Sequence, residues 1–384
     1  MRFTWTDDQI ALRDTLLKFV AQRFPFEHRK RRIEGGFDPA AWAELADLGA
    51  LGMPFDEACG GSGGSALDTL IIMEAFGRSL VVEPFMSCII LAGSVIRHGA
   101  LPEQQRRLIP SIAAGEARYA CAFAEEQSRY NLANVTTRAV QHGDHFRLNG
   151  KKAVVYGAPD SHTLIVAART AGESTAAEGI SLFLVPTESA GLSLRSYTCI
   201  DGMAAADVSL VDVQVGQDGV LGELHQALPA LERAIDDATT AICGEAVGIM
   251  GALIERCIEH AKSRQAFGKP LAQFQVIGHR IVDLQVSYEV AAASALKAAA
   301  AQDLSPADRR RAVSAAKVQV AREAAFVGKS AVQLHGAMGT TDELDIGHYF
   351  KRLMTIQTLF GGADFHLRRY IQAGETQMKV GNGY

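Results

Sequence analysis

The most constraining feature of this 384-residue sequence is a pattern of apolar residues that changes twice along the chain. From Tyr119 to Gln217 the apolar residues form short β-branched runs separated by Gly, Asn and Asp, which is typical of strands and turns. Before and after this segment, apolar residues recur at the spacing of amphipathic helices. The sequence therefore predicts an α+β chain, mostly α, with a β domain of roughly 100 residues between two helical regions.

The expected domains are an N-terminal helical domain at 1–118, a central β domain at 119–224 and a C-terminal helical bundle at 225–384. Thr6 or Asp7 is expected to cap the first helix, and Pro39 to lie in the first turn of another. The Gly-Asp and Asn-Gly pairs of "QHGDHFRLNGKK" predict hairpin turns between strands. The long Ala-rich segment from Phe274 to Lys329 predicts closely packed helices, which agrees with a buried helical interface between subunits.

Composition limits the partners and the compartment. The formal net charge is −5 and there is no long Lys/Arg run, so nucleic acid is not an expected partner. No run of about 18 apolar residues predicts a membrane span, and the N-terminus lacks the pattern of a signal or transit peptide. The six cysteines form no CxxC pair and no zinc-like spacing with His, so we expect no metal site and six buried thiols in a reducing, cytoplasmic environment.

The sequence has no Gly-rich phosphate loop, GxSxG or HExxH motif. Two segments in the C-terminal third are therefore the clearest indication of function. They are "SRQAFGKPLAQFQ" and "AVQLHGAMGTTDE". In this order, and together with "GMPFDEACGGSGG" and "RLNGKKAVV", they resemble the acyl-CoA dehydrogenase family over essentially the whole chain. The segments "AEEQSRYNLANV" and "GHYFKRLMTIQTLFGGAD" are similar to the small subunits of pimeloyl-CoA dehydrogenase-type two-subunit enzymes.

The resemblance implies an N-terminal helical domain, a central β-barrel or sandwich domain and a C-terminal four-helix bundle that contributes to FAD binding and to the oligomer interface. It also implies FAD, an acyl-CoA substrate and α,β-desaturation, in which a carboxylate removes the α-proton and the β-hydride goes to flavin N5. The α-proton of a thioester is weakly acidic, so such a site needs donors that polarise the carbonyl and a base within hydrogen-bond reach. A homo- or hetero-tetramer is the implied assembly, and electron-transfer flavoprotein is the implied acceptor.

The family's FAD site is shared between subunits, because the two C-terminal segments reach the diphosphate and adenine of a neighbour's FAD. Carried over to this sequence, the contacting residues are Arg264, Phe267, Gln275, Gln333 and Gly336. An Arg guanidinium offers paired donors to a diphosphate, and a glycine lets the backbone approach a phosphate closely. An ordinary helix-capping loop remains the alternative interpretation.

The flavin end departs from the family pattern. Where the family has T-E-P-x-x-G-S-D, this sequence has "AEEQSRYN", so Ala124 replaces the Thr, while Ser128 and Tyr130 remain as hydrogen-bond donors. Where the family has W-I-T-N, this sequence has "VVYG", with Val154 in place of the stacking Trp and Tyr156 in place of the Thr. Ser128, Tyr130 and Tyr156 are the candidate flavin contacts, and the changes weaken the expectation that this chain's own β domain binds the flavin.

The family's catalytic base is missing at both positions where relatives carry it. The Glu of Y-E-G-T falls on Gly361, which leaves a backbone N–H that could bind a thioester carbonyl, and the Glu of a second branch falls on Ala238. The nearest carboxylates in sequence are Asp364 and Asp237. Asp364 precedes "FHLRRYIQ" and has two interpretations, an N-cap of the last helix or a displaced base. Asp237 is more simply a solvated or paired helix residue.

The first functional hypothesis is a FAD-dependent acyl-CoA dehydrogenase, acting as one subunit of a hetero-oligomer, with Asp364 as its base. The second is a catalytically decayed subunit that completes the FAD site of a Glu-bearing partner. A flavin monooxygenase or oxidase is a third alternative, because loss of the base removes the need for α-proton abstraction. A dicarboxyl-CoA such as pimeloyl-CoA is the suggested substrate, and Arg129, Arg195 or His366 would then bind its acidic tail.

Overall fold

The computed structural model describes residues 5–381, with side chains through residue 374. The described chain divides into two compact units. The helical unit contains residues 5–29, 66–81 and 239–381, and the β unit contains residues 30–65 and 82–238. The order of helices, a sheet and further helices confirms the predicted α+β, mostly α, fold class. The predicted domain limits stay a prediction.

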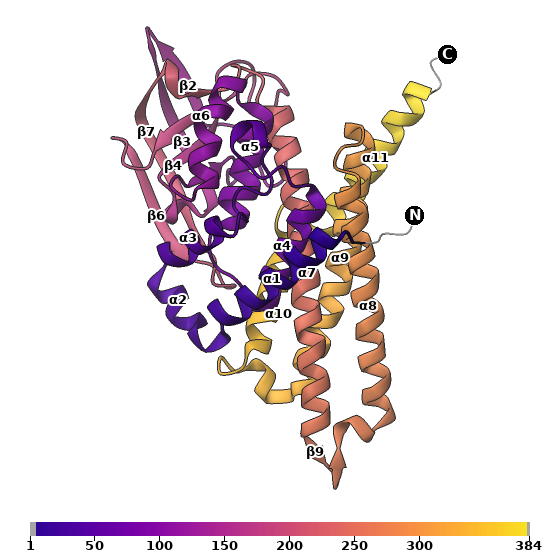
Figure 1. The fold of residues 1–384 in the computed structure, drawn as a ribbon. Helices are drawn as coiled ribbons and strands as arrows, with labels where there is room; N and C mark the ends of the chain where they lie inside the picture. Colours follow the sequence, from indigo (N-terminus) through magenta and orange to yellow (C-terminus); the bar gives the residue numbers. More distant parts are fainter. Residues whose placement is uncertain (1–4, 382–384) are drawn as a thin grey trace. The chain divides into compact units, whose positions relative to one another are not determined.

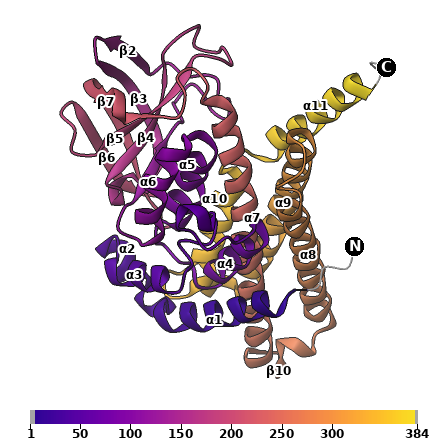
Figure 2. The ribbon, with the colours of Figure 1, turned by 45° about the horizontal axis from the view of Figure 1, so that its top comes forward.

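Long helices make up the helical unit, and α8 and α9 lie side by side in both ribbon views (Figure 1 and Figure 2). Thr6 caps α1 in a capping box with Gln9, and Ser305 caps α9 by accepting from the Asp308 N–H. Helix α7 begins in the β unit and ends in the helical unit. The helices are α1 (Asp7–Arg23), α4 (Ala66–Ser79), α7 (Leu228–Ser263), α8 (Gln275–Ala300), α9 (Pro306–His335), α10 (Asp345–Thr358) and α11 (Ala363–Gly381).

Helices α4 and α7 touch backbone to backbone. A Cβ on Gly77 would lie 2.1 Å from the Glu245 carbonyl oxygen, and a Cβ on Gly248 would lie 1.9 Å from the Glu74 carbonyl oxygen. Both positions therefore require glycine. The Glu245 side chain is buried and binds Arg352 of α10 through two charge-assisted hydrogen bonds of 2.6 and 2.7 Å, so α10 is joined to the same contact.

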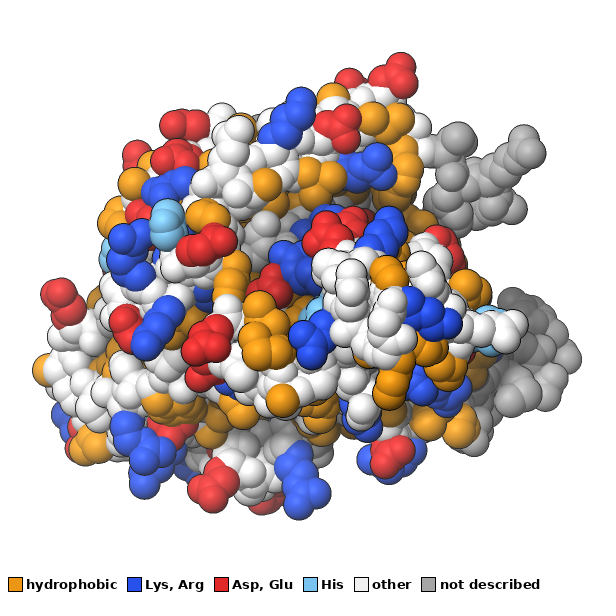
Figure 3. All heavy atoms as spheres, turned by 90° about the horizontal axis from the view of Figure 1, so that it is seen from below, with side chains coloured by type: hydrophobic (Ala, Val, Ile, Leu, Met, Phe, Trp, Pro, Cys, Tyr) orange, Lys and Arg blue, Asp and Glu red, His pale blue; other side chains and the backbone are white. Residues whose placement is uncertain are grey.

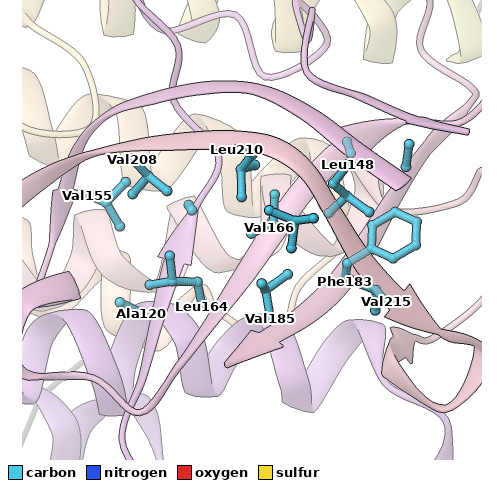
Figure 4. Close-up of a cluster of buried hydrophobic side chains, with 14 of the residues drawn as sticks. Ala120, Leu148, Val155, Leu164, Val166, Phe183, Val185, Val208, Leu210 and Val215 are labelled. Atoms are coloured by element: carbon cyan, nitrogen blue, oxygen red, sulfur yellow. The ribbon is translucent and has the colours of Figure 1, made fainter. Parts of the chain in front are cut away.

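The β unit is built around one sheet with the strand order β6-β7-β3-β2-β4-β5-β8, and β1 pairs in parallel with β4. Figure 4 shows its core, in which side chains such as Leu148, Val166 and Phe183 meet between the strands. The helices are α2 (Arg29–Gly35), which begins in the helical unit, α3 (Pro39–Asp47), α5 (Gly93–Gly99) and α6 (Pro102–Ala113). The strands are β1 (Tyr119–Ala122), β2 (Arg138–His142), β3 (His145–Tyr156), β4 (Thr163–Arg169), β5 (Ile180–Pro186), β6 (Leu192–Thr198), β7 (Ala204–Gly216) and β8 (Val220–Leu221).

The predicted Gly-Asp turn connects β2 and β3 and is confirmed. The predicted turn at Asn149-Gly150 is wrong, because β3 continues through both residues. The Asn149 side chain instead exchanges two hydrogen bonds of 2.9 Å with Asp212 of β7. Gly150 lies at a register shift, where a Cβ would stand 2.6 Å from the Thr137 Cα. Close approach of Thr137, which immediately precedes β2, rather than a turn, explains this glycine.

The prediction of six buried thiols is wrong for Cys59 and Cys199, which are half-buried; the other four are buried and free. Between residues 5 and 381 there is no helix with the length and hydrophobicity of a membrane span. The same residues contain no group of three or more His, Cys, Asp or Glu side chains placed to bind a metal. Acidic and basic side chains are interspersed on the face drawn in Figure 3, in keeping with the small net charge.

Candidate functional site

The loop between α7 and α8 is a short hairpin. Its strands are β9 (Gln265–Ala266) and β10 (Lys269–Pro270). Phe267 and Gly268 between them have φ of +51° and +80°, as two-residue hairpin turns require. A hydrogen bond of 2.9 Å from the Leu271 N–H to the Arg264 carbonyl closes the base. The Arg264 side chain is exposed and the Phe267 ring is 96% exposed, so both can contact a molecule from outside the chain.

The end of α9 forms a turn near this hairpin, which lies at the end of α7 in Figure 1. Gln333 is exposed in the last turn of α9, and Gly336 has φ +63° and ψ −142°, a conformation that favours glycine. No described atom lies within 4 Å of the position that a Gly336 Cβ would take. The His335 ring contacts the His260 ring of α7, with 4.4 Å between centroids. The structure therefore brings the Arg264 hairpin and the Gly336 turn to the same end of the helical unit.

These positions fit the diphosphate and adenine part of a dinucleotide. Arg264 offers paired donors to phosphate oxygens, Gly336 presents open backbone, and Phe267 offers a flat apolar ring. Gln275 is exposed at the first residue of α8. The predicted contacts for this end are thus all exposed on the helical unit.

Ser128, a predicted flavin contact in the β unit, already uses its hydroxyl. The hydroxyl donates to the Glu125 carbonyl at 2.8 Å and accepts from the Glu125 N–H at 2.9 Å, and the residue is 6% exposed. The buried Glu125 carboxylate binds Lys152 of β3 at 2.7 Å and accepts from the N–H groups of Thr136 and Thr137. Ser128 therefore closes a local turn and does not point a free hydroxyl at a ligand.

The Glu125–Lys152 pair is a structural element that the sequence pattern does not signal, because its members are 27 residues apart. Burial alone would raise the pKa of the Glu125 carboxyl, but the Lys152 ammonium and hydrogen bonds from Lys152, Thr136 and Gln127 lower it to about 2. Burial lowers the pKa of Lys152, and the charge of Glu125 opposes that shift. The charged pair fixes the segment after β1 against β3.

Val154 is the residue that the resemblance aligns with the family's stacking Trp. It is 45% exposed, has φ +52°, and lies where the pairing of β3 with β7 is irregular. Its N–H donates to Asp207 Oδ1 at 3.1 Å, and the same carboxylate pairs with Arg195 at 2.5 Å. Tyr130 is 39% exposed, and Tyr156, two residues after Val154 in β3, is half-buried, whereas position 154 itself carries no aromatic ring.

Gly361, where the resemblance places the family's base, lies in the turn between α10 and α11. It has φ +121°, and a Cβ there would lie 2.5 Å from Phe365 Cδ1 and 2.8 Å from His366 Nε2. The space for a side chain is therefore filled by the first turn of α11. The Gly361 N–H donates to the Thr358 carbonyl at 3.1 Å, which contradicts the prediction that it is available to a thioester carbonyl.

His366 holds this turn from inside the helical unit. Its residue is fully buried, its Nε2 lies 3.2 Å from the Phe360 carbonyl oxygen, and its Nδ1 lies 3.3 Å from Ser314 Oγ. Burial and the charges of Lys317 and Arg369 lower its pKa to about 3. The neutral ring donates from Nε2 to the carbonyl and accepts from Ser314, so His366 is not placed to bind an acidic acyl tail.

Lys317 of α9 fixes the other side of the turn. The buried ammonium donates to the carbonyls of Ile356 and Leu359, the latter at 2.8 Å. Burial lowers the pKa of Lys317 to about 8. Sequence reasoning missed Lys317 because a Lys in a helical stripe is normally at the surface. The end of α10 is therefore capped by a buried cation.

Asp364 and Asp237, the carboxylates nearest in sequence to the two positions of the family's base, do not lie in the surroundings that a catalytic base needs. Asp364 is exposed and is the second residue of α11, and the His366 N–H bonds to the Gly362 carbonyl. Gly362 rather than Asp364 is thus the N-cap, which corrects the capping prediction. Asp237 accepts from Ser94 at 2.6 Å and pairs with Arg233 at 3.1 Å, so it belongs to a polar cluster of the β unit.

Comparison with known proteins finds relatives along nearly the whole chain. Three family models match: "Acyl-CoA dehydrogenase, N-terminal domain" at residues 6–116, the "middle domain" at 120–213 and the "C-terminal domain" at 228–374. The caffeyl-CoA reductase-Etf complex subunit CarC of Acetobacterium woodii is 28% identical, over 84% of this chain and 86% of that protein. Butyryl-CoA dehydrogenase from Megasphaera elsdenii is 23% identical with a TM-score of 0.90, over 97% and 99% of the two chains. A chain of the ChsE4-ChsE5 complex from Mycobacterium tuberculosis is 22% identical in sequence with a TM-score of 0.85, over 97% of this chain and 98% of that chain.

Proposed function

Because this chain belongs to the acyl-CoA dehydrogenase family of oxidoreductases acting on CH–CH bonds, we propose that it is one subunit of a two-chain, FAD-dependent acyl-CoA dehydrogenase. In this proposal the chain completes the FAD site of a Glu-bearing partner in a hetero-tetramer. The predicted cofactor, FAD, agrees with the family. The second hypothesis of the sequence analysis is therefore preferred over the first.

The filled turn at Gly361 is the observation that carries this proposal. The position has no side chain, and its neighbours Phe365 and His366 occupy the direction in which a Glu would extend. The alternative base position, Ala238, is fully buried and apolar. A chain without a carboxylate at either position lacks a base where relatives carry it, which supports a partner subunit that removes the α-proton.

The two ends of the cofactor site support the same conclusion. Residues that would serve a neighbour's FAD, such as Arg264 and Gly336, are exposed and open. Residues that would serve this chain's own flavin are altered, since Ser128 is occupied by its own turn and Val154 replaces a stacking ring. The residues that would serve a neighbour's FAD are thus more complete in this chain than those that would serve its own flavin.

The roles of the chain's residues follow from their chemistry. FAD, when bound, accepts the hydride of the acyl β-carbon. Arg264 would pair with its phosphates, the Gly336 backbone would approach them closely, and Phe267 would cover the adenine and exclude water. Electron-transfer flavoprotein is the proposed acceptor; the name of the CarC relative, which includes an Etf complex, supports it. The two-chain ChsE4-ChsE5 complex supports a hetero-oligomer.

A dicarboxyl-CoA such as pimeloyl-CoA remains the proposed substrate, on the resemblance alone. Of the three cations suggested for its tail, His366 is buried and neutral. Arg195 is 81% exposed at its side chain and pairs with Asp207. Arg129 is exposed at φ +47° beside Tyr130, and we propose it as the tail contact.

The proposal is tested by purifying the chain alone and after co-expression with a Glu-bearing candidate partner, and measuring FAD per chain and bleaching by acyl-CoA. We expect little FAD in the lone chain and a bleachable flavin in the complex. Arg264→Gln should lower FAD retention of the complex, whereas Lys262→Gln, at an exposed neighbouring position, should not. Stoichiometric, bleachable FAD in the lone chain would refute the partner role.

The competing candidate, Asp364 as a displaced base, is separated by a second variant. Its exposed position in the first turn of α11 leaves it accessible, which is the observation in its favour. Asp364→Asn should leave bleaching of the complex unchanged if the partner supplies the base. A loss of bleaching with FAD retained would favour the displaced base instead.

A further inference from the structure

We propose that His260 and His335 are positioning residues that hold the Arg264 hairpin and the Gly336 turn together, and that protonation of His260 releases them. The inference rests on the proposed function, because it assigns a regulation to the same cofactor-binding end. Neither histidine is among the residues predicted to contact FAD.

The imidazole pair joins the ends of the two helices that lead into these segments, α7 and α9. The rings are 4.4 Å apart at an angle of 33°, and His335 is 9% exposed. Nδ1 of His335 lies 2.8 Å from the Ala331 carbonyl oxygen, so Nδ1 carries a proton and the ring orientation is fixed from within α9. His260, from α7, therefore packs against a ring that cannot turn away without losing a hydrogen bond.

Movement of His260 is transmitted to the hairpin through the backbone. The Arg264 N–H donates to the His260 carbonyl at 2.8 Å, and the Leu271 N–H donates to the Arg264 carbonyl at 2.9 Å. The Ser263 hydroxyl donates to the Glu259 carbonyl at 2.9 Å. A displaced His260 thus moves the residue whose guanidinium is proposed to bind phosphate. On the other side, His335 immediately precedes Gly336 in the α9 turn.

The contact favours a neutral His260 ring. Burial lowers the pKa of His260, and the charges of His335 and Arg264, the described groups that act on it, lower it further. Since the folded pKa lies below the ordinary value of 6.5, the contribution of the pair is present above that pH and is lost as the pH falls through the folded pKa. A protonated His260 would lie beside the positive charge of Arg264, which disfavours the contact.

The test measures hydrogen exchange of residues 264–274 in the lone chain from about pH 8 to about pH 5, corrected for intrinsic exchange. His260→Phe keeps a ring in the contact and removes the titrating group, and His260→Ala removes both. We expect wild-type protection to fall roughly threefold or more with acidification, His260→Phe to show no such step, and His260→Ala to be poorly protected throughout. Identical pH profiles for wild type and His260→Phe would overturn the inference.

FAD retention by the complex with the partner gives a second readout. Retention should fall over the same pH range in wild type and stay constant in His260→Phe. If the hairpin opens with acid but FAD retention does not change, the proposed cofactor role of Arg264 fails while the coupling between the imidazole pair and the hairpin stands. If neither changes, the pair has no positioning role.

Discussion

Restoring the family's base by Gly361→Glu should destabilise the protein and should not create a dehydrogenase. The new Cβ would lie 2.5 Å from Phe365 Cδ1 and 2.8 Å from His366 Nε2, at a backbone φ of +121°. A non-glycine residue in such a conformation costs about 1–3 kcal/mol, and forcing extra atoms into a packed site costs about 1–3 kcal/mol. The free energy of unfolding should fall by about 2–6 kcal/mol.

Urea unfolding followed by circular dichroism measures this loss, and flavin bleaching by acyl-CoA tests for gained activity. Gly362→Glu is the matched control, since it adds the same carboxylate one residue later. No described atom lies within 4 Å of a Gly362 Cβ, and Gly362 is not at positive φ. Because Gly362 is the N-cap of α11, the control should cost no more than about 1 kcal/mol. A Gly361→Glu chain that is as stable as this control, or that bleaches flavin alone, would refute the reasoning.

Further predictions concern packing and buried charge. Gly248→Ala places a Cβ 1.9 Å from the Glu74 carbonyl oxygen and should lower the free energy of unfolding by about 3 kcal/mol. The control Gly278→Ala, in open space on α8, should be neutral or stabilising by up to about 1 kcal/mol. Equal urea midpoints for the two variants would contradict the α4–α7 contact. Lys152→Met leaves the Glu125 carboxylate buried without its ammonium and should cost about 3–5 kcal/mol at neutral pH. Because the pKa of Glu125 is lowered to about 2 from 4.5, the pair's contribution should be lost as pH falls from about 4.5 to about 2, and urea midpoints should decline less over that range in Lys152→Met than in wild type.

The sequence predicts the plan of the fold because its signals are local. The 3.6-residue spacing, the Gly-Asp turn and the Thr6 cap each depend on a few neighbouring residues, and the structure confirms them. The Asn149-Gly150 pair has the same local signature as a turn, but its outcome depends on Asp212, which is 63 residues away. The pairing of β3 with β7 therefore keeps Asn149 and Gly150 in a strand, although their local sequence favours a turn.

The candidate site shows the same division. Positions such as Arg264 and Gly336 can be predicted from the sequence, because each belongs to a motif of consecutive residues. The groups that decide what the Gly361 turn can do, Lys317 and His366, are ordinary helix positions whose burial depends on how α9, α10 and α11 pack. Their roles become visible only when the helices are assembled.

The filled turn also has a consequence for inheritance. A carboxylate at Gly361 is blocked until Phe365 and His366 have moved, and His366 in turn bonds the Phe360 carbonyl. A carboxylate gained at Gly361 alone is therefore expected to destabilise the turn. We expect a lineage that carries this turn to depend on a second gene for its base, and selection to keep both genes together or lose them together.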